Sequence, residues 1–294
     1  MTEIVIPPNE TPKKLENFLK RQFPIGFVRK LFRKSAVRIN GRRPKATDLI
    51  KPGDRVQIYL PFESEKKLTA SVRKLADLEL VFEDDTLLVI NKPAGIAVHE
   101  GKTVSKQASV LGILETRYRS QGVKPLLVHR LDKDTSGLLL IAKNQQTADE
   151  LMKIFQSRDV DKGYLCLVVG RLAPNRGTID FPLPGREGTL VNALTRYEVT
   201  KRFSETTLVR VTIETGRLHQ IRLHFARVGY PVVMDHQHGD FAFNKRFRKQ
   251  YGLKRQFLHA QRLKLHYAGK THQWKAPVPD DLRKTLALLE VGQA

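Results

Sequence analysis

The chain has 294 residues, 40% of them hydrophobic, which is enough for one large domain and a second small one. Its 52 Lys and Arg outnumber its 30 Asp and Glu, and the formal net charge of +22 favours a polyanionic partner, above all nucleic acid. From the composition we expect neither a membrane span nor a signal peptide, and the single cysteine, Cys166, excludes a disulfide framework.

A basic segment near the N-terminus predicts a small nucleic-acid-binding module. Twelve Lys or Arg and one acid, Glu16, fall between positions 13 and 45. Thr11 and Pro12 predict the start of a first short helix, a second helix follows, and Asn40-Gly41 predicts a hairpin turn. The expected phosphate contacts are cations of the second helix and the turn: Lys30, Arg33, Lys34, Arg42 and Arg43. The alternative is a solvated basic face without a ligand.

The rest of the chain predicts a larger α+β domain. Residues 63–77 are polar and without a core pattern, which predicts a linker between domains at 1–62 and 78–294. Strands are expected at 78–82, 87–90, 137–142, 162–169, 195–201, 206–213 and 262–267, and helices at 105–118, 148–155 and 219–228. Because these do not follow a strict βαβ rhythm, we expect a central mixed, mainly antiparallel sheet.

The centre of the chain, His129-Arg130-Leu131-Asp132, stands before a turn and an apolar strand. Such a loop, held by rigid elements, is a typical place for a reactive group. Of its two acids, Asp134 matches turn chemistry, in which the side chain bonds a backbone amide two residues on. Asp132 has no such structural explanation and is the better candidate. A cation such as Arg222 would keep the Asp132 carboxylate ionised in a site from which water is excluded. The alternative for Arg222 is an arginine that is merely solvated at the surface.

The sequence lacks the residue patterns that nucleotide-binding, serine-nucleophile and metal sites require. There is no phosphate-cradling glycine loop and no nucleophile-elbow pattern around Ser136. His219 and His224 are five positions apart and share no face of a helix or a strand. His236 and His238 could share a strand face but have no third ligand nearby, so we expect no metal site.

Four ordered motifs then carry a family resemblance. They are Asn91-Lys92-Pro93-Ala94-Gly95 with His99, His129-Arg130-Leu131-Asp132 with Thr135-Ser136-Gly137, Lys162-Gly163-Tyr164, and Gly216-Arg217 with His219-Gln220-Ile221-Arg222 and His224. From about residue 78 onward the chain resembles the RluA family of RNA pseudouridine synthases. Residues 1–62 resemble the S4-type RNA-binding domain, which also fits that family. The tail, with Met234-Asp235 and Gly239-Asp240, is similar to a branch acting on large-subunit ribosomal RNA.

The resemblance implies a role for each matching residue. Asp132 would be the catalytic aspartate, and Arg222 would pair with it and keep it ionised. Tyr164 would stack on the target base and help to move its proton. Arg130 would fill the gap left when the nucleotide leaves its stack. The remaining implied residues are His129 as a further substrate contact, Ile221 packing beneath the site, and Lys92 with Pro93 in an architectural role.

The implied activity is the isomerisation of specific uridines to pseudouridine in large-subunit (23S) ribosomal RNA, by base flipping, cleavage of the glycosidic bond and reattachment through C5. It implies no cofactor, no metal, no membrane partner, a cytoplasmic location and a monomer. The alternatives are a non-catalytic ribosome assembly factor on the same fold and, less well supported, a metal-dependent nuclease. Two positions depart from the family pattern: Leu218 replaces a Thr or Ser, and His238 replaces a Tyr common in that branch.

Overall fold

The computed structural model describes residues 2–8, 10–23, 25–59, 78–101, 104–185 and 188–292. The chain forms two compact units that divide between Lys74 and Leu75. The predicted linker at 63–77 lies outside the described residues, so the domain limits stay predictions. No helix among the described residues is long and apolar enough to cross a membrane.

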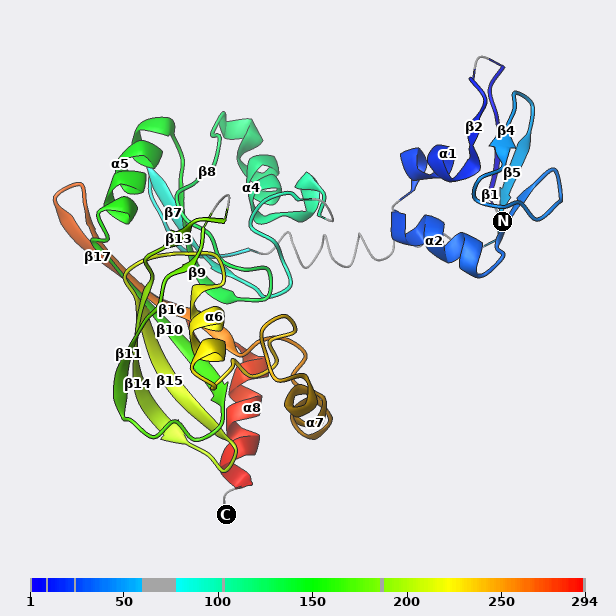
Figure 1. The fold of residues 1–294 in the computed structure, drawn as a ribbon. Helices are drawn as coiled ribbons and strands as arrows, with labels where there is room; N and C mark the ends of the chain where they lie inside the picture. Colours follow the sequence, from blue (N-terminus) through cyan, green and yellow to red (C-terminus); the bar gives the residue numbers. More distant parts are fainter. Residues whose placement is uncertain are drawn as a thin grey trace. The chain divides into compact units, whose positions relative to one another are not determined.

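The N-terminal unit contains two short helices and small antiparallel sheets (Figure 1). Its elements are β1 (Thr2–Val5), β2 (Lys13–Lys14), α1 (Leu15–Gln22), α2 (Ile25–Arg33), β3 (Val37–Ile39), β4 (Leu49–Ile50) and β5 (Arg55–Ile58). The predicted helix start at Thr11 and Pro12 is wrong. Residues 13 and 14 pair with β4 instead, so the helix begins at Leu15. The apolar faces of both helices are buried in one core, and the five predicted phosphate contacts are exposed.

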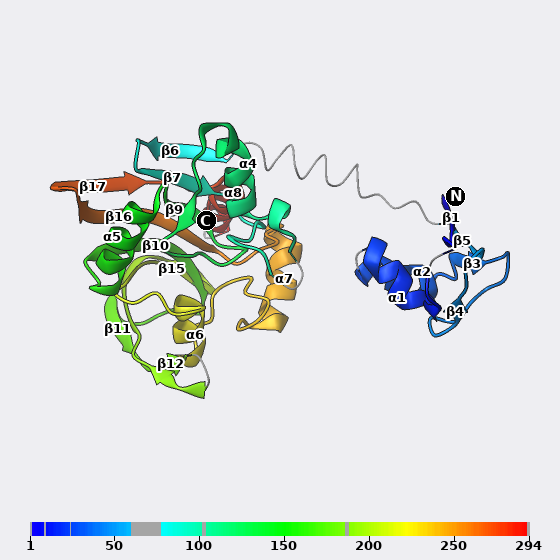
Figure 2. The same cartoon turned by 90° about the horizontal axis from the view of Figure 1, so that it is seen from above.

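One mixed sheet organises the second unit, from Leu75 to Ala294 and called the catalytic unit once its site is described, in the order β11-β14-β15-β10-β16-β9-β7-β6, with β17 on β16 and β8 on β9 (Figures 1 and 2). Every pair is antiparallel except β16 with β9. The predicted fold class is therefore confirmed. The strands are β6 (Glu79–Glu83), β7 (Leu87–Lys92), β8 (Leu126–Leu127), β9 (Ser136–Ala142), β10 (Val160–Val169), β11 (Arg176–Asp180), β14 (Leu194–Arg202), β15 (Thr206–Ile213), β16 (Leu258–Tyr267) and β17 (Lys270–Lys275), with a separate pair β12 (Leu183–Pro184) and β13 (Leu190–Val191).

Helices pack on both faces of this sheet. They are α4 (Val110–Tyr118), α5 (Gln145–Gln156), α6 (Gln220–Arg227), α7 (Phe241–Tyr251) and α8 (Asp280–Val291), with 3-10 turns at Lys106–Ala108 and Arg119–Gln121. Side chains alternate across a strand. Leu165 and Leu167 of β10 pack with α7 and α8, and Cys166 and Val168 pack with α6. The helix expected at 105–118 is broken, because Ser109 caps a new helix by accepting from the amide of Gly112.

A glycine brings β9 and β16 together in parallel. Gly137 lies opposite Ala260 and has φ 113°, a backbone region that favours glycine. A Cβ atom at this position would lie 2.1 Å from the carbonyl oxygen of Ala260. Only glycine permits this approach, which fixes the start of β9 and hence the loop that carries Asp132.

Candidate active site

A buried lysine, Lys92, bonds the backbone of the loop that carries Asp132. Lys92 is fully buried, and its Nζ donates to the carbonyl oxygens of Pro93 at 2.9 Å, Ile96 at 2.9 Å and Lys133 at 3.0 Å. Burial lowers the pKa of Lys92 to about 7. These bonds agree with the architectural role implied for this residue.

The turn after Asp132 differs from the one predicted. The backbone N–H of Thr135 donates to the carbonyl oxygen of Asp132 at 3.1 Å and closes the turn. Within the described residues, no hydrogen bond holds the Asp134 carboxylate, so the expected side-chain turn bond is wrong. Instead, Gln256 donates to the Thr135 hydroxyl at 2.7 Å and Arg255 to the Ser136 hydroxyl at 3.1 Å. The segment before β16 thus fastens the loop that carries Asp132.

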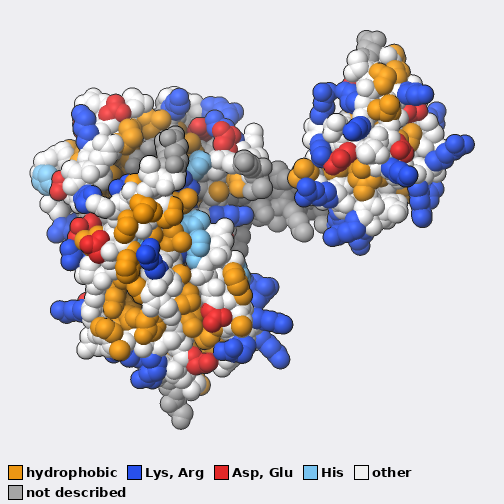
Figure 3. All heavy atoms as spheres, viewed as in Figure 1, with side chains coloured by type: hydrophobic (Ala, Val, Ile, Leu, Met, Phe, Trp, Pro, Cys, Tyr) orange, Lys and Arg blue, Asp and Glu red, His pale blue; other side chains and the backbone are white. Residues whose placement is uncertain are grey.

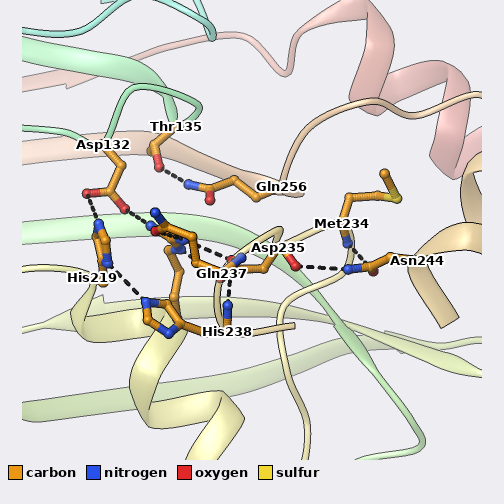
Figure 4. A network of polar contacts seen from close by, with 10 residues as sticks. Asp132, Thr135, His219, Met234, Asp235, Gln237, His238, Asn244 and Gln256 are labelled. Atoms are coloured by element: carbon orange, nitrogen blue, oxygen red, sulfur yellow. Dashed lines mark hydrogen bonds and ion pairs between the residues drawn. The ribbon is translucent and has the colours of Figure 1, made fainter. Parts of the chain in front are cut away.

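Arg222 joins two carboxylates. Its Nη1 donates to Asp132 Oδ2 at 3.0 Å, and its Nε and Nη2 form a fork with Asp235 at 2.7 and 2.8 Å (Figure 4). The exposed fraction is 18% for the Asp132 side chain, 5% for Arg222 and 0% for Asp235. Asp132 is therefore the member of this trio that can reach a substrate.

The electrostatics fix the charges of Arg222 and Asp235. Burial opposes the charged guanidinium, but the hydrogen bonds and charge of Asp235, followed by those of Asp132, outweigh it and raise the pKa of Arg222. Burial likewise works against an ionised Asp235. Bonds from Arg222 and from the amides of Gln237 and His238 prevail and lower its pKa. The Arg222 guanidinium therefore stays protonated, and its fork with Asp235 holds it in one orientation.

His219 lies on the other side of Asp132, at the start of α6. Its Nε2 is 3.8 Å from Asp132 Oδ1, and its Nδ1 shares a hydrogen bond of 3.0 Å with His238 Nε2 (Figure 4). Burial lowers the pKa of His219, against the opposing pull of Asp132. The helix start lacks a hydroxyl at Leu218. The Oε1 of Gln220 organises it by accepting from the Thr215 hydroxyl at 2.7 Å and the Arg217 amide at 3.1 Å.

Asp132 borders two cavities. The larger, of about 570 Å³, is lined by Tyr164, Ile221 and Arg222 among others, and its size suits a small ligand. A bulge between Gly163 and Tyr164 in the pairing of β10 with β16 interrupts the ladder beside the site. Burial, and secondarily the charge of Asp132, raise the pKa of Tyr164, so its hydroxyl is protonated at neutral pH. Ile221 is 4% exposed and forms part of the cavity wall.

The two residues before Asp132 behave differently. Arg130 is exposed, lines both cavities and has no ion pair with the residues that the structure describes. His129 Nε2 accepts from the Leu140 amide at 2.9 Å, and its ring stacks on Phe155 at 4.7 Å. Burial lowers the pKa of His129 to about 3. His129 therefore fastens the loop to β9, and its contact with RNA stays a prediction.

Comparisons with known proteins decide the family. A family model described as "RNA pseudouridylate synthase" matches residues 86–227. "Ribosomal large subunit pseudouridine synthase C" of Vibrio parahaemolyticus is 34% identical, over 93% of this chain and 92% of its own length. The protein of that name from Escherichia coli is 33% identical, over 97% and 96%. This chain belongs to the RNA pseudouridine synthases. The resemblance to their RluA family is confirmed.

A solved structure supports the same fold for this synthase. "Human RNA Pseudouridylate Synthase Domain Containing 4" superposes with a TM-score of 0.62 and 26% identity, covering 79% of this chain and 98% of that one.

The structure brings Asp132, Tyr164, Arg222, Arg130, His129 and Ile221 around one cavity, as the motifs of the synthase family imply. The five N-terminal cations belong to the other compact unit. No three His, Cys, Asp or Glu side chains gather in the manner of metal ligands within the described ranges.

Sequence reasoning gave no role to Asp235 or Lys162. Asp235 entered only as part of the tail motif, because nothing in the sequence shows that its loop returns to α6. Lys162 lines the larger cavity, its Nζ donates to the Glu214 carbonyl oxygen at 3.2 Å, and burial lowers its pKa to about 8. The Lys162-Gly163-Tyr164 motif was the sequence signal that could have pointed to Lys162 as a site residue.

Proposed function

We propose that this synthase converts specific uridines of large-subunit (23S) ribosomal RNA to pseudouridine, with Asp132 as the catalytic carboxylate. The observation that carries the proposal is the placement of Asp132. It lies at the edge of the 570 Å³ cavity and is bonded to Arg222, which Asp235 holds in turn. The substrate class rests on the printed names of the relatives, which are ribosomal large subunit synthases.

The reaction balances without an imported group. The bond from ribose C1′ to base N1 breaks, the base rotates, and a new bond joins C1′ to C5. The proton of C5 is lost and N1 gains one, so product and substrate are isomers. The sugar passes through a cation-like state, which a nearby carboxylate stabilises or attacks, as in glycoside hydrolysis. Both routes are open to Asp132. No oxidant or cofactor enters the balance.

The other residues serve the flipped base. Extruding a nucleotide costs about a few kcal/mol, and stacking on an aromatic ring returns roughly 1–3 kcal/mol. Tyr164 lines the cavity with a neutral hydroxyl, and we assign to it the stacking on the base and the relay of the C5 proton. Arg130, exposed at the mouth of the cavity, would fill the space that the nucleotide leaves.

The N-terminal unit would add affinity for RNA. Its exposed cations at Lys30, Arg33, Lys34, Arg42 and Arg43 suit phosphate contacts, and we assign residues 1–62 to an S4-type RNA-binding domain. We further propose that the enzyme works as a metal-independent monomer in the cytoplasm, on ribosomal RNA or an assembling subunit.

Mapping pseudouridines in ribosomal RNA from cells with and without this gene tests the function. We expect the loss of pseudouridine at defined large-subunit positions, restored by the intact gene and not by an Asp132→Asn copy. An unchanged map together with defective subunits would support the non-catalytic assembly factor and contradict the proposal.

A further inference from the structure

Helix α7 presents a cationic face to solvent beside the active-site loop. Between residues 241 and 254 the sequence has five Lys or Arg and no acid. All five are exposed: Lys245, Arg246, Arg248, Lys249 and Lys254. Figure 3 shows Lys and Arg side chains gathered over α7, at the lower right of the catalytic unit. Of these five cations, Arg246 alone has an ion pair with a described residue, a 3.6 Å contact with Glu205 in which both side chains are about two-thirds exposed.

The inner face of α7 is bonded to the loop that holds Arg222. Phe243 and Phe247 pack into the core, and Asn244 between them is 4% exposed. The Asn244 Oδ1 accepts from the Met234 amide at 2.7 Å, and its Nδ2 donates to the Asp235 carbonyl oxygen at 2.9 Å (Figure 4). Two hydrogen bonds of one buried side chain therefore join the helix to the loop.

Gly239 also lies in close contact with Asp235 and Asn244. A Cβ atom at Gly239 would lie 2.3 Å from the Asp235 carbonyl oxygen and 2.9 Å from Asn244 Nδ2. From Asp235 the connection continues through Arg222 to the carboxylate of Asp132. The outer face of α7 is thus at a fixed distance from the catalytic group.

The same loop leads from α7 to the site. His236 and Gln237 line the smaller cavity, of about 410 Å³, together with Arg130 and Asp132. Phe241, at the first turn of α7, is 62% exposed. Residues four and seven positions apart share a helix face, so Phe241, Lys245 and Arg248 form one stripe that begins where the loop ends.

We propose that this stripe, with Lys249, binds the RNA backbone next to the target uridine. The inference rests on the proposed function and adds a second contact surface within the catalytic unit. Unpaired cations bind phosphates without regard to sequence, and an exposed aromatic ring offers a stacking surface for a neighbouring base. Because Asn244 fixes α7 to the loop of Asp235, a strand bound there is held in a set position relative to Asp132.

The test is the salt dependence of binding to an unmodified transcript of large-subunit ribosomal RNA, using the full chain. Lys245→Gln/Arg248→Gln/Lys249→Gln removes three charges from α7. Lys264→Gln/Lys270→Gln/Lys275→Gln removes three exposed charges from the β16–β17 hairpin and is the matched control. Each phosphate contact contributes about 0.7 to the slope of log affinity against log salt on single strands. We expect the α7 variant to lose about 2 from the slope and at least about tenfold in affinity.

A second pair of variants tests the aromatic contact. Phe241→Ala should weaken binding, and Phe241→Tyr, which keeps the ring, should restore it. Equal slopes and affinities for the α7 variant and the hairpin control would overturn the inference. So would loss of binding to phosphatidylglycerol vesicles with unchanged RNA affinity, which would make α7 a membrane contact.

The outcomes separate this inference from the proposed function. If the wild type forms pseudouridine but the α7 variant binds normally, the inference alone fails. If the α7 variant loses affinity and the wild type forms no pseudouridine, the proposed function alone fails.

Discussion

Asp132 depends on a cation that is itself held by a second acid. A lone exposed arginine would point in many directions, whereas the fork with Asp235 leaves only Nη1 of Arg222 for Asp132. The sequence motifs predicted roles for Asp132, Tyr164 and Arg222, which the structure brings to one cavity. They did not reveal Asp235, because a single acid in a loop carries no periodic signal and its partner is thirteen positions away. They also suggested a turn bond for Asp134 that the backbone makes unnecessary.

Arg222→Ala should remove most activity and stability together. Asp132 loses its charge partner, and Asp235 is left as a buried charge without one, which costs roughly 3–5 kcal/mol in the free energy of unfolding. Urea unfolding and pseudouridine formation measure the two effects. Arg227→Ala, an exposed arginine of the same helix whose guanidinium lies 4.6 Å from the centre of the Phe181 ring, is the control. It should keep normal activity and lose no more than about 1 kcal/mol of stability. A normal rate and pH–rate profile in Arg222→Ala would contradict the role of the pair.

At the scale of elements, strongly patterned segments were predictable and polar ones were not. β15 begins and ends where its alternation and apolar content indicated, at Thr206 and Ile213. α7 was missed although Asp240 caps its start and Gly252 follows its end, because its many cations mask the apolar face. The pairing of β9 with β16 could not be predicted from the sequence, because it joins segments more than a hundred residues apart.

Gly137→Ala tests that pairing. The added Cβ atom meets the Ala260 carbonyl oxygen, and φ of 113° is strained for alanine. We expect destabilisation by about 1–3 kcal/mol, with reduced turnover because the Asp132 loop leads into this strand. Urea unfolding of the variant measures the loss, and a midpoint equal to that of the wild type would contradict the close approach.

At the scale of the whole molecule, the alternation of elements predicted the fold class but not the order of strands, which depends on contacts distant in sequence. Composition predicted a polyanionic partner, above all nucleic acid, and the N-terminal cations are exposed on a unit of their own. Folding also buries neutral histidines in the catalytic unit. Burial lowers the pKa of His129 to about 3 and that of His259 to about 4.

These histidines predict acid sensitivity. Their folded pKa values lie below the ordinary 6.5, so the unfolded chain takes up more protons as the pH falls. Their contribution to stability is therefore complete above about pH 6.5 and is lost progressively toward pH 4, by at most about 1.4 kcal/mol per pH unit and group. Urea midpoints at pH 7 and pH 5 measure this loss. His129→Gln should flatten the difference, and an equal difference in that variant would contradict the assignment.

Deleting residues 1–60 tests the role of the N-terminal unit. Removing its cations should weaken binding to ribosomal RNA and reduce the salt dependence of that binding, because fewer phosphates are neutralised. A titration at several salt concentrations measures both. An undiminished slope would mean that this unit does not contact RNA.

The most direct test of the central claim is pseudouridine formation by Asp132→Asn on an unmodified large-subunit ribosomal RNA transcript. The substitution keeps the shape of the side chain and removes its charge and nucleophilicity, and Asp134→Asn in the same loop is the control. We predict no pseudouridine from Asp132→Asn, RNA affinity close to that of the wild type, and normal turnover by Asp134→Asn. Turnover near the wild-type rate in Asp132→Asn would contradict the assignment of Asp132 as the catalytic carboxylate.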